Sequence, residues 1–230
     1  MLEKLKEQVC EANLQLVREG LVVQTWGNVS GIDRQSRYVV IKPSGVPYDQ
    51  MRPAHMVVIG LDAGRALEEQ LRPSSDTATH LELYRAFPSI GSIVHTHSLY
   101  ATAWAQAQRE IPILGTTHAD YFNGPIPCTR LLSDEEVQSD YERNTGHVIV
   151  ERFARLDPLQ IPAALVAGHA PFVWGTNVLK AVENAIVLEY VARLASETLK
   201  VNPDVTFLRP ALLDKHFLRK HGPGAYYGQK

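Results

Sequence analysis

Apolar residues recur at intervals of three and four along several segments, as they do on the buried face of an amphipathic helix. Residues 2–17 carry such a stripe and predict an opening helix, and residues 178–199 predict a longer one. Shorter helices are expected over residues 101–108 and after Asp76 and Thr77, which can cap a helix start. The apolar positions behind these expectations are Leu2, Leu5, Val9, Leu14 and Val17, then Leu81, Leu83 and Tyr84, and finally Ala181, Ala185, Leu188 and Ala192.

Short apolar runs of strand length lie between these helices. They are residues 38–41, 56–61, 90–97, 163–166 and 172–174. Because the predicted strands and helices interleave, we expect an α/β protein with a sheet covered by helices. The end of the chain, residues 212–229, is rich in His, Lys, Arg, Gly and Tyr. It is expected either as a frayed terminus or as a segment whose aromatic side chains dock on a surface.

Composition narrows the class of protein further. The chain has 230 residues, 45% of them hydrophobic, which is enough for one domain over residues 1–230 with a sizeable core. The formal net charge is −2 and no basic stripe is present, which argues against nucleic-acid binding. No hydrophobic signal core and no run of membrane-spanning length occurs, so a cytoplasmic protein without membrane contact is expected. The distant cysteines, Cys10 and Cys128, fit ordinary thiols of such a protein.

A candidate metal site comes from three histidines and a carboxylate. If residues 90–97 form a strand, alternation places His95 and His97 on the same face. Together with Asp76 and His169, they offer an oxygen and nitrogen donor set suited to Zn²⁺ or a similar divalent ion. The absence of thiolates favours a catalytic metal over a closed structural site. The alternative is that these histidines only form hydrogen bonds with the backbone.

Three short elements have the composition of anion-binding loops. Their small residues let backbone N–H groups approach a ligand, and their hydroxyl groups add donors. Lys42 and Arg219 could add positive charge. Each element alone is consistent with an ordinary turn, so a phosphate pocket is expected only if the fold gathers them. The elements are Gly27 with Asn28, Ser44 with Gly45, and Ser74 with Ser75.

Longer motifs resemble those of the class II aldolase/adducin-type family. Within that family, the chain is similar to the L-ribulose-5-phosphate 4-epimerases over essentially its whole length. The motifs are WGNVS at 26–30, KPSGV at 42–46, PSSDT at 73–77, IVHTHS at 93–98, GTTHADYF at 115–122, RKHG at 219–222 and YYGQ at 226–229.

The resemblance implies a fold, an assembly and a set of ligands. The fold would be an α/β/α sandwich with a central, largely antiparallel sheet. The assembly would be a C4 homotetramer in which the tail, about residues 212–230, completes a neighbouring subunit's active site. Zn²⁺, or another divalent ion, would be held by Asp76, His95, His97 and His169. The phosphate group of a ketopentose phosphate would contact Gly27, Asn28, Ser44, Gly45, Ser74 and Ser75, with Lys42 nearby.

The resemblance also implies an isomerase reaction, the C4 epimerisation of L-ribulose 5-phosphate to D-xylulose 5-phosphate. The C4 proton is not acidic, so inversion needs retro-aldol cleavage of the C3–C4 bond. The products are an enediolate and glycolaldehyde phosphate, which turns and adds back. A Lewis-acid metal stabilises the developing charge, and each aldehyde face needs an acid/base group. Asp120 would be one such group and Tyr227 of the adjacent subunit the other, with His216 and Arg219 lining the same wall.

Two other functions fit parts of the pattern. The first is an aldolase of the same family that cleaves fuculose or rhamnulose 1-phosphate. The resemblance implies an acid/base Glu near the metal in such enzymes, where this chain has the shorter Asp76. The second is a non-catalytic, adducin-like scaffold, which would be expected to lose ligands that this chain keeps. Leu99, Tyr100 and Asn123 depart from the family motifs and leave substrate preference open. Supply of the substrate by arabinose or by ascorbate degradation also stays open.

Overall fold

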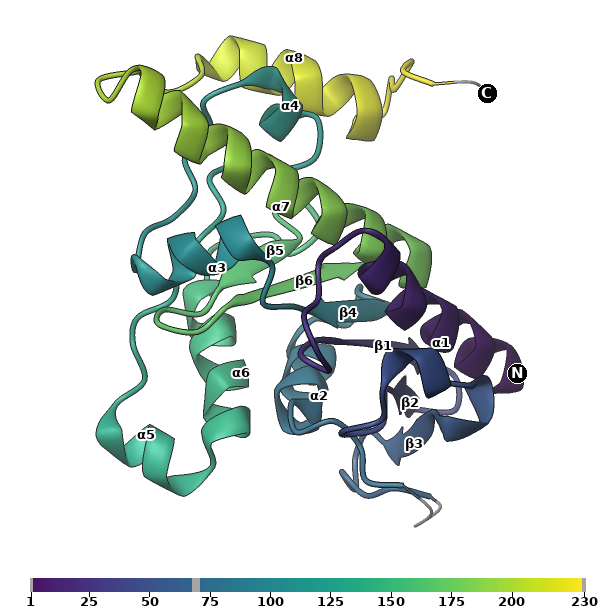
Figure 1. The fold of residues 1–230 in the computed structure, drawn as a ribbon. Coiled ribbons are helices and arrows are strands. Elements are labelled where there is room, and N and C mark those ends of the chain that lie inside the picture. Colours follow the sequence, from purple (N-terminus) through teal and green to yellow (C-terminus); the bar gives the residue numbers. More distant parts are fainter. Residues whose placement is uncertain (1, 68–70, 229–230) are drawn as a thin grey trace.

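The computed structural model describes residues 2–67 and 71–228, so residues 229 and 230 of the expected tail lie outside the described residues. Within the described residues, six strands form one antiparallel sheet in the order β3-β2-β1-β4-β6-β5 (Figure 1). The expected antiparallel sheet is thereby confirmed. The strands are β1 (Asn28–Asp33), β2 (Tyr38–Ile41), β3 (Val57–Gly60), β4 (Ser92–His95), β5 (Ala163–Leu165) and β6 (Pro171–Gly175).

Helices account for most of the remaining regular structure. α7 is the longest, and the Asn177 side chain caps its start by accepting a hydrogen bond from the Lys180 amide. The α-helices are α1 (Leu2–Arg18), α2 (Thr77–Ala86), α3 (Leu99–Gln106), α4 (Thr116–Ala119), α5 (Asp134–Ser139), α6 (Tyr141–Arg152), α7 (Val178–Val201) and α8 (Pro210–His221). Two short 3₁₀ helices, η1 (Tyr48–Gln50) and η2 (Pro53–His55), lie between β2 and β3. No helix in the described part of the chain is both long and apolar enough to cross a membrane.

Alternation along β1 directs neighbouring residues to opposite faces of the sheet. Ser30 Oγ lies 2.7 Å from both His80 Nδ1 and Tyr84 Oη, so this face carries α2. Gly31 faces α1, where a Cβ atom would lie only 2.8 Å from Leu5 Cδ1. Glycine therefore lets α1 approach the sheet closely. Figure 1 shows α1 and α7 over one face and α2 with α6 on the other, which is the expected α/β/α sandwich.

The observed elements differ from the sequence expectations in several places, and α4, α5 and α6 were not predicted at all. β1 was not predicted as a strand, because Asn28, Ser30 and Gly31 are weak strand formers. The expected strand over residues 90–97 is shorter, and β4 ends at His95. Most of the expected tail is ordered as α8, which packs with α4, and is not a frayed terminus (Figure 1).

Candidate functional site

A cavity of about 500 Å³ opens where β1 and β4 meet the loops that precede α2 and follow β2. It contains residues from segments far apart in the sequence, which the sheet order brings together. β1 pairs with β4 so that Asn28 lies opposite His95. The side chains that line it form two groups, one of imidazoles and one of small, hydroxyl-bearing and basic residues.

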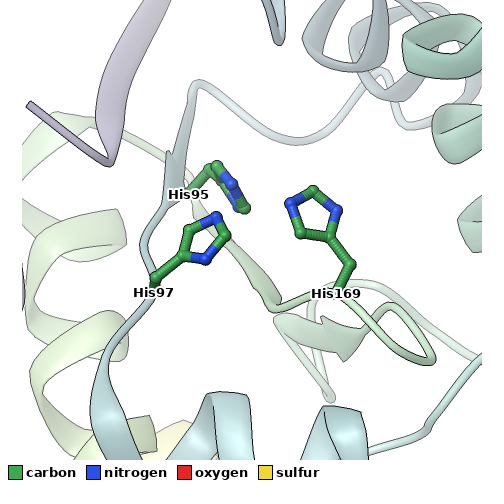
Figure 2. A group of neighbouring side chains, drawn as sticks. All are labelled: His95, His97 and His169. Atoms are coloured by element: carbon green, nitrogen blue, oxygen red, sulfur yellow. The ribbon is translucent and has the colours of Figure 1, made fainter.

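The histidine group consists of His95, His97 and His169. Among the described residues, these three each offer a ligand nitrogen within 4.8 Å of the others, as a shared metal ion requires. His95 ends β4, His97 follows two residues later, and His169 lies in the turn between β5 and β6. Figure 2 shows the three rings converging on one space. His95 and His97 therefore point to the same space, as expected from their spacing, although β4 already ends at His95.

Hydrogen bonds orient two of these rings. His95 Nδ1 donates to the Pro171 carbonyl at 2.9 Å, and the ring stacks on Phe172 at 4.2 Å between centroids. The other ring nitrogen, Nε2, is then left with its lone pair for a metal. His169 Nδ1 forms a 3.3 Å hydrogen bond with the Tyr141 hydroxyl. A hydrogen bond to one ring nitrogen fixes the tautomer and the orientation of a metal-ligating imidazole, and both histidines have one.

Burial favours the neutral form of two members of the histidine group, His97 and His169. It lowers the pKa of His169 to about 4, and the neighbouring imidazoles His95 and His97 add to this effect. Burial also lowers the pKa of His97, with His95 contributing in the same direction. The neutral imidazole is the form that binds a metal ion, so burial favours the metal-binding form of His97 and His169.

Asp76 lies beside the histidine group. Its Oδ2 atom is 4.0 Å from His95 Nε2 and accepts a 2.6 Å hydrogen bond from Asn28 Nδ2. Burial raises the pKa of this carboxyl, but the neighbouring histidines, His95 and His80 first, and the Asn28 hydrogen bond together leave the pKa below its usual value. Asp76 does occupy the N-cap position of α2, yet its side chain forms no capping hydrogen bond. The capping role that the sequence suggested for this carboxylate is therefore wrong, and the carboxylate is free to face the cavity.

A second wall of the cavity, here called the anion wall, is formed by the three predicted loops and Lys42. Backbone hydrogen bonds from Ser44 N to Arg72 O and from Ser74 N to Lys42 O, both 2.9 Å, join two of the loops. Asn28 Nδ2 reaches Ser74 Oγ at 3.1 Å and brings in the third. The residues of the anion wall are Gly27, Asn28, Lys42, Ser44, Gly45, Ser74 and Ser75.

Two residues of the anion wall, Gly27 and Lys42, are closely surrounded by other atoms. Gly27 has a φ of +118°, and a Cβ atom there would lie 3.1 Å from the His95 carbonyl oxygen. Lys42 is only 2% exposed, and its ammonium donates a 3.3 Å hydrogen bond to the Pro43 carbonyl. Burial lowers the pKa of Lys42, and the nearby Asp76 carboxylate opposes that shift. A phosphate group would give this buried cation a partner of opposite charge.

The remaining predicted residues form a separate cluster, the Asp120 cluster. Arg219 Nη2 lies 2.9 Å from both carboxylate oxygens of Asp120, and His216 Nδ1 lies 3.1 Å from Oδ1. The Tyr227 ring packs against Arg219, with 4.8 Å from Cζ to the ring centroid. Burial raises the pKa of Asp120, but the bonds from Arg219 and His216 outweigh it and hold the pKa below its usual value. The cluster joins α4 to α8 and the segment after it.

The Asp120 cluster does not line the cavity of its own chain. The suggestion that Arg219 adds charge to the anion loops is wrong within one protomer, because Arg219 is paired with Asp120 instead. Asp120 and Tyr227 also belong to the same cluster of one chain. The residues that the sequence missed are Thr25, Trp26, Tyr141 and Glu142, which line the cavity. Tyr141 and Glu142 begin α6, for which the sequence offered no helix signal.

The fold and the site together define an α/β protein with a candidate metal centre beside an anion pocket. Residues 7–196 match the family described as Class II Aldolase and Adducin N-terminal domain, and the chain belongs to this family.

Solved structures of similar fold agree with this membership. An L-fuculose 1-phosphate aldolase is 22% identical with a TM-score of 0.78, over 93% of this chain and 94% of that one. YgbL from Klebsiella pneumoniae is also 22% identical, with a TM-score of 0.72 over 94% and 98% of the two chains. The l-fuculose-1-phosphate aldolase from Thermus thermophilus is 20% identical, with a TM-score of 0.66 over 89% and 98%. At these identities the likeness concerns the fold alone.

Proposed function

We propose that this protein is a zinc-dependent epimerase that converts L-ribulose 5-phosphate to D-xylulose 5-phosphate by breaking and re-forming the C3–C4 bond. One observation carries the proposal: a single cavity holds both the histidine group and the anion wall. A phosphorylated sugar has two polar ends that such a cavity can bind separately. Its phosphate fits the anion wall, and its carbonyl and hydroxyl oxygens fit the imidazole end.

The donor set fits a divalent metal. Three imidazoles and a nearby carboxylate match the nitrogen and oxygen ligands that a catalytic zinc site uses. When bound, the metal supplies positive charge that stabilises the oxyanion of a retro-aldol step. His95 and His169 are held for this role by the Pro171 carbonyl and the Tyr141 hydroxyl. Asp76 would lie beside the metal, because the Asn28 amide holds its carboxylate next to His95.

The anion wall would hold the two-carbon fragment between cleavage and re-addition. Glycolaldehyde phosphate must turn its carbonyl carbon and expose the other face without leaving the cavity. Lys42 and the hydroxyl groups of Ser44 and Ser75 would hold the phosphate, so rotation about the bonds to the phosphate can present either face. Retention of this fragment is what separates an epimerase from an aldolase.

The Asp120 cluster would supply the proton-transfer groups. Its carboxylate is held in the ionised form, as a general base requires, and Tyr227 offers a phenol beside it. Because the cluster lies outside the cavity of its own chain, we place it in the cavity of a neighbouring subunit. A C4 homotetramer would repeat this arrangement at every interface. Asp120, His216, Arg219 and Tyr227 would then all come from the same neighbour.

Asp76 favours the epimerase over the aldolase. Its short side chain is committed to His95 and Asn28 and is poorly placed to act as a mobile acid/base group. The two activities are distinguished by a coupled assay that measures D-xylulose 5-phosphate and free aldehyde from L-ribulose 5-phosphate. We expect D-xylulose 5-phosphate as the main product, with activity lost on chelation and regained with Zn²⁺. Accumulation of glycolaldehyde phosphate as the main product would favour the aldolase.

A further inference from the structure

Tyr48 lies behind the anion wall and contacts two of its residues. It begins η1 and is 8% exposed. Its hydroxyl donates a 2.8 Å hydrogen bond to the Gly27 carbonyl, and its ring centroid lies 5.0 Å from Lys42 Nζ. Tyr48 itself is not one of the cavity-lining residues. Any effect it has on a bound anion must therefore pass through Gly27 and Lys42.

The two contacts hold two separate loops of the anion wall. Residues 43–47 form the loop that carries Ser44 and Gly45, and Lys42 and Tyr48 flank it on either side. The contact between the Lys42 ammonium and the Tyr48 ring therefore closes the base of this loop. The Tyr48 hydroxyl then ties the closed loop to the Gly27 turn, which precedes β1. Burial raises the pKa of Tyr48, so the hydroxyl stays protonated and remains a donor.

The surroundings of the Lys42 ammonium show what the Tyr48 ring contributes. Its ammonium is buried, and across the described residues its hydrogen bonding amounts to one 3.3 Å contact with the neighbouring Pro43 carbonyl. A buried cation with so few hydrogen bonds is costly. The face of an aromatic ring attracts a cation, and the attraction strengthens when both groups are shielded from water. The Tyr48 ring thus supports the ammonium on one side and leaves its other N–H groups available for a ligand.

We propose that Tyr48 is a positioning residue for the phosphate group of the substrate. Its ring holds the Lys42 ammonium, and its hydroxyl holds the Gly27 turn, so the donors of the anion wall are in place before the ligand arrives. Hydrogen-bond donors that are already in place raise the affinity for a ligand, because less conformational entropy is lost on binding. The inference rests on the proposed function, since it takes a sugar phosphate to be the ligand of this wall.

Two substitutions separate the two contacts. Tyr48→Phe removes the hydroxyl and keeps the ring, and Tyr48→Leu removes both. The probe is inorganic phosphate, whose Kd is measured by calorimetry on the zinc-loaded protein. We expect Tyr48→Phe to raise Kd about 5-fold, the usual worth of one hydrogen bond. Tyr48→Leu should raise Kd a further 5-fold or so through the lost cation–π contact. With L-ribulose 5-phosphate, KM should rise while kcat stays within about 2-fold of wild type.

A double-mutant cycle tests whether the ring acts through Lys42. In a Lys42→Met background, Tyr48→Phe and Tyr48→Leu should bind phosphate equally, because the ring then has no cation to hold. Tyr38→Leu, a half-buried tyrosine at the other end of β2, is the matched control and should leave Kd unchanged. If Tyr48→Leu does not fold, Tyr48→Phe with and without Lys42→Met still tests the hydroxyl, whose effect should persist in both backgrounds.

The outcomes separate this inference from the function on which it rests. Phosphate binding by wild type that is unchanged in Tyr48→Phe, or in a folded Tyr48→Leu, overturns the positioning role and leaves the proposed function intact. A ring effect that persists at full size in the Lys42→Met background also overturns it. Failure of the wild type to bind phosphate or to turn over the sugar phosphate contradicts the proposed function itself and removes the basis for this role.

Discussion

At the scale of single residues, three converging imidazoles are the main feature of the site. His97 is half-buried, and the other two members of its group lie 5.0 Å away between ring centroids. Loss of a hydrogen-bond partner that only orients a ligand typically weakens metal binding about 10- to 100-fold. Loss of a ligand nitrogen itself should therefore cost at least about 100-fold.

We expect His97→Asn to lose most of its bound zinc and its activity, and to keep its circular dichroism spectrum. The sheet and its helices form a large core that does not depend on a metal. His147→Asn, at an exposed histidine on α6, is the control and should keep its zinc. Elemental analysis after gel filtration gives the readout. A normal zinc content in His97→Asn would remove this residue from the ligand set.

A second residue-scale prediction concerns His118, which is buried in α4 close to the Asp120 cluster. Burial lowers its pKa to about 4, although its hydrogen bond with the Gly124 carbonyl opposes the shift. An unfolded histidine titrates near pH ~6.5. Between these values the unfolded chain binds the proton and the folded chain does not, so stability is full above about pH 6.5 and falls as the pH drops toward about 4.

The expected slope is roughly 1 kcal/mol per pH unit for this residue within that window. Urea unfolding of the metal-free protein, measured at several pH values between about 4 and 7.5, gives the slope. His118→Gln should reduce this slope of unfolding free energy against pH by about the same amount, whereas His147→Gln should leave the slope unchanged. Equal slopes in wild type and His118→Gln would show that His118 titrates alike in both states.

The three histidines and the small-residue loops that meet in the cavity were predictable from the sequence, but their arrangement was not. The spacing of His95 and His97 reports a shared strand face, which local geometry dictates. The separation of Arg219 from the anion wall depends on the position of α8, and no local pattern encodes that. Tyr141 and Tyr48 gave no signal either, because their roles arise only from contacts with His169 and Lys42.

At the scale of elements, α3 depends on a carboxylate from another helix. Ser98 is its N-cap and forms no side-chain cap. Instead, Glu189 on α7 accepts hydrogen bonds from the Tyr100 and Ala101 amides at 2.8 and 2.9 Å. Throughout the part of the chain that the structure describes, no ion pair involves Glu189, so these amides are its main partners. Because α3 begins two residues after His97, this cap also holds in place the backbone that follows His97, a proposed metal ligand.

We expect Glu189→Leu to lower the free energy of unfolding by about 1–2 kcal/mol, as loss of a helix cap does. Hydrogen exchange at Tyr100 and Ala101 should accelerate with it. Glu197→Leu removes an exposed carboxylate from the same helix and should leave the free energy of unfolding nearly unchanged. Urea denaturation measures both. Similar losses in the two variants would mean that the cap contributes nothing specific.

Element prediction succeeded where the pattern was strong and failed where tertiary contacts decided the structure. The periodic segment at residues 178–199 became α7, with nearly the same bounds. β1 was missed because its residues are determined by contacts with other parts of the molecule. Asn28 forms a hydrogen bond with Asp76 in the cavity, and Ser30 forms one with His80 on α2. Gly31 leaves the space into which α1 packs. Such residues depart from strand propensity for reasons that only the folded molecule contains.

At the scale of the whole molecule, the proposed tetramer makes a prediction about mixed assemblies. Asp120 and Tyr227 belong to one cluster that lies outside its own cavity. His97 belongs to the cavity. Mixing inactive Tyr227→Phe and His97→Asn should therefore restore activity, because some sites combine an intact cavity with an intact cluster. Mixing Asp120→Asn with Tyr227→Phe should restore none, since neither chain has a complete cluster.

Subunit exchange is verified by native mass spectrometry, and activity is measured after exchange reaches equilibrium. A mixture of Asp120→Asn with His97→Asn is the positive control. It should also regain activity, because some sites again combine an intact cavity with an intact cluster. If the mixture of Tyr227→Phe and His97→Asn stays inactive despite verified exchange, the cluster does not act in a neighbouring cavity.

The central claim is that C4 is inverted by breaking and re-forming the C3–C4 bond, without removal of the C4 proton. The most direct measurement is turnover of L-ribulose 5-phosphate in D₂O by the zinc-loaded protein, with the product followed by proton NMR. We predict D-xylulose 5-phosphate that keeps protium at C4, because the proton stays on the aldehyde fragment held by the anion wall. Deuterium at C4, or free glycolaldehyde phosphate in place of D-xylulose 5-phosphate, would contradict the account.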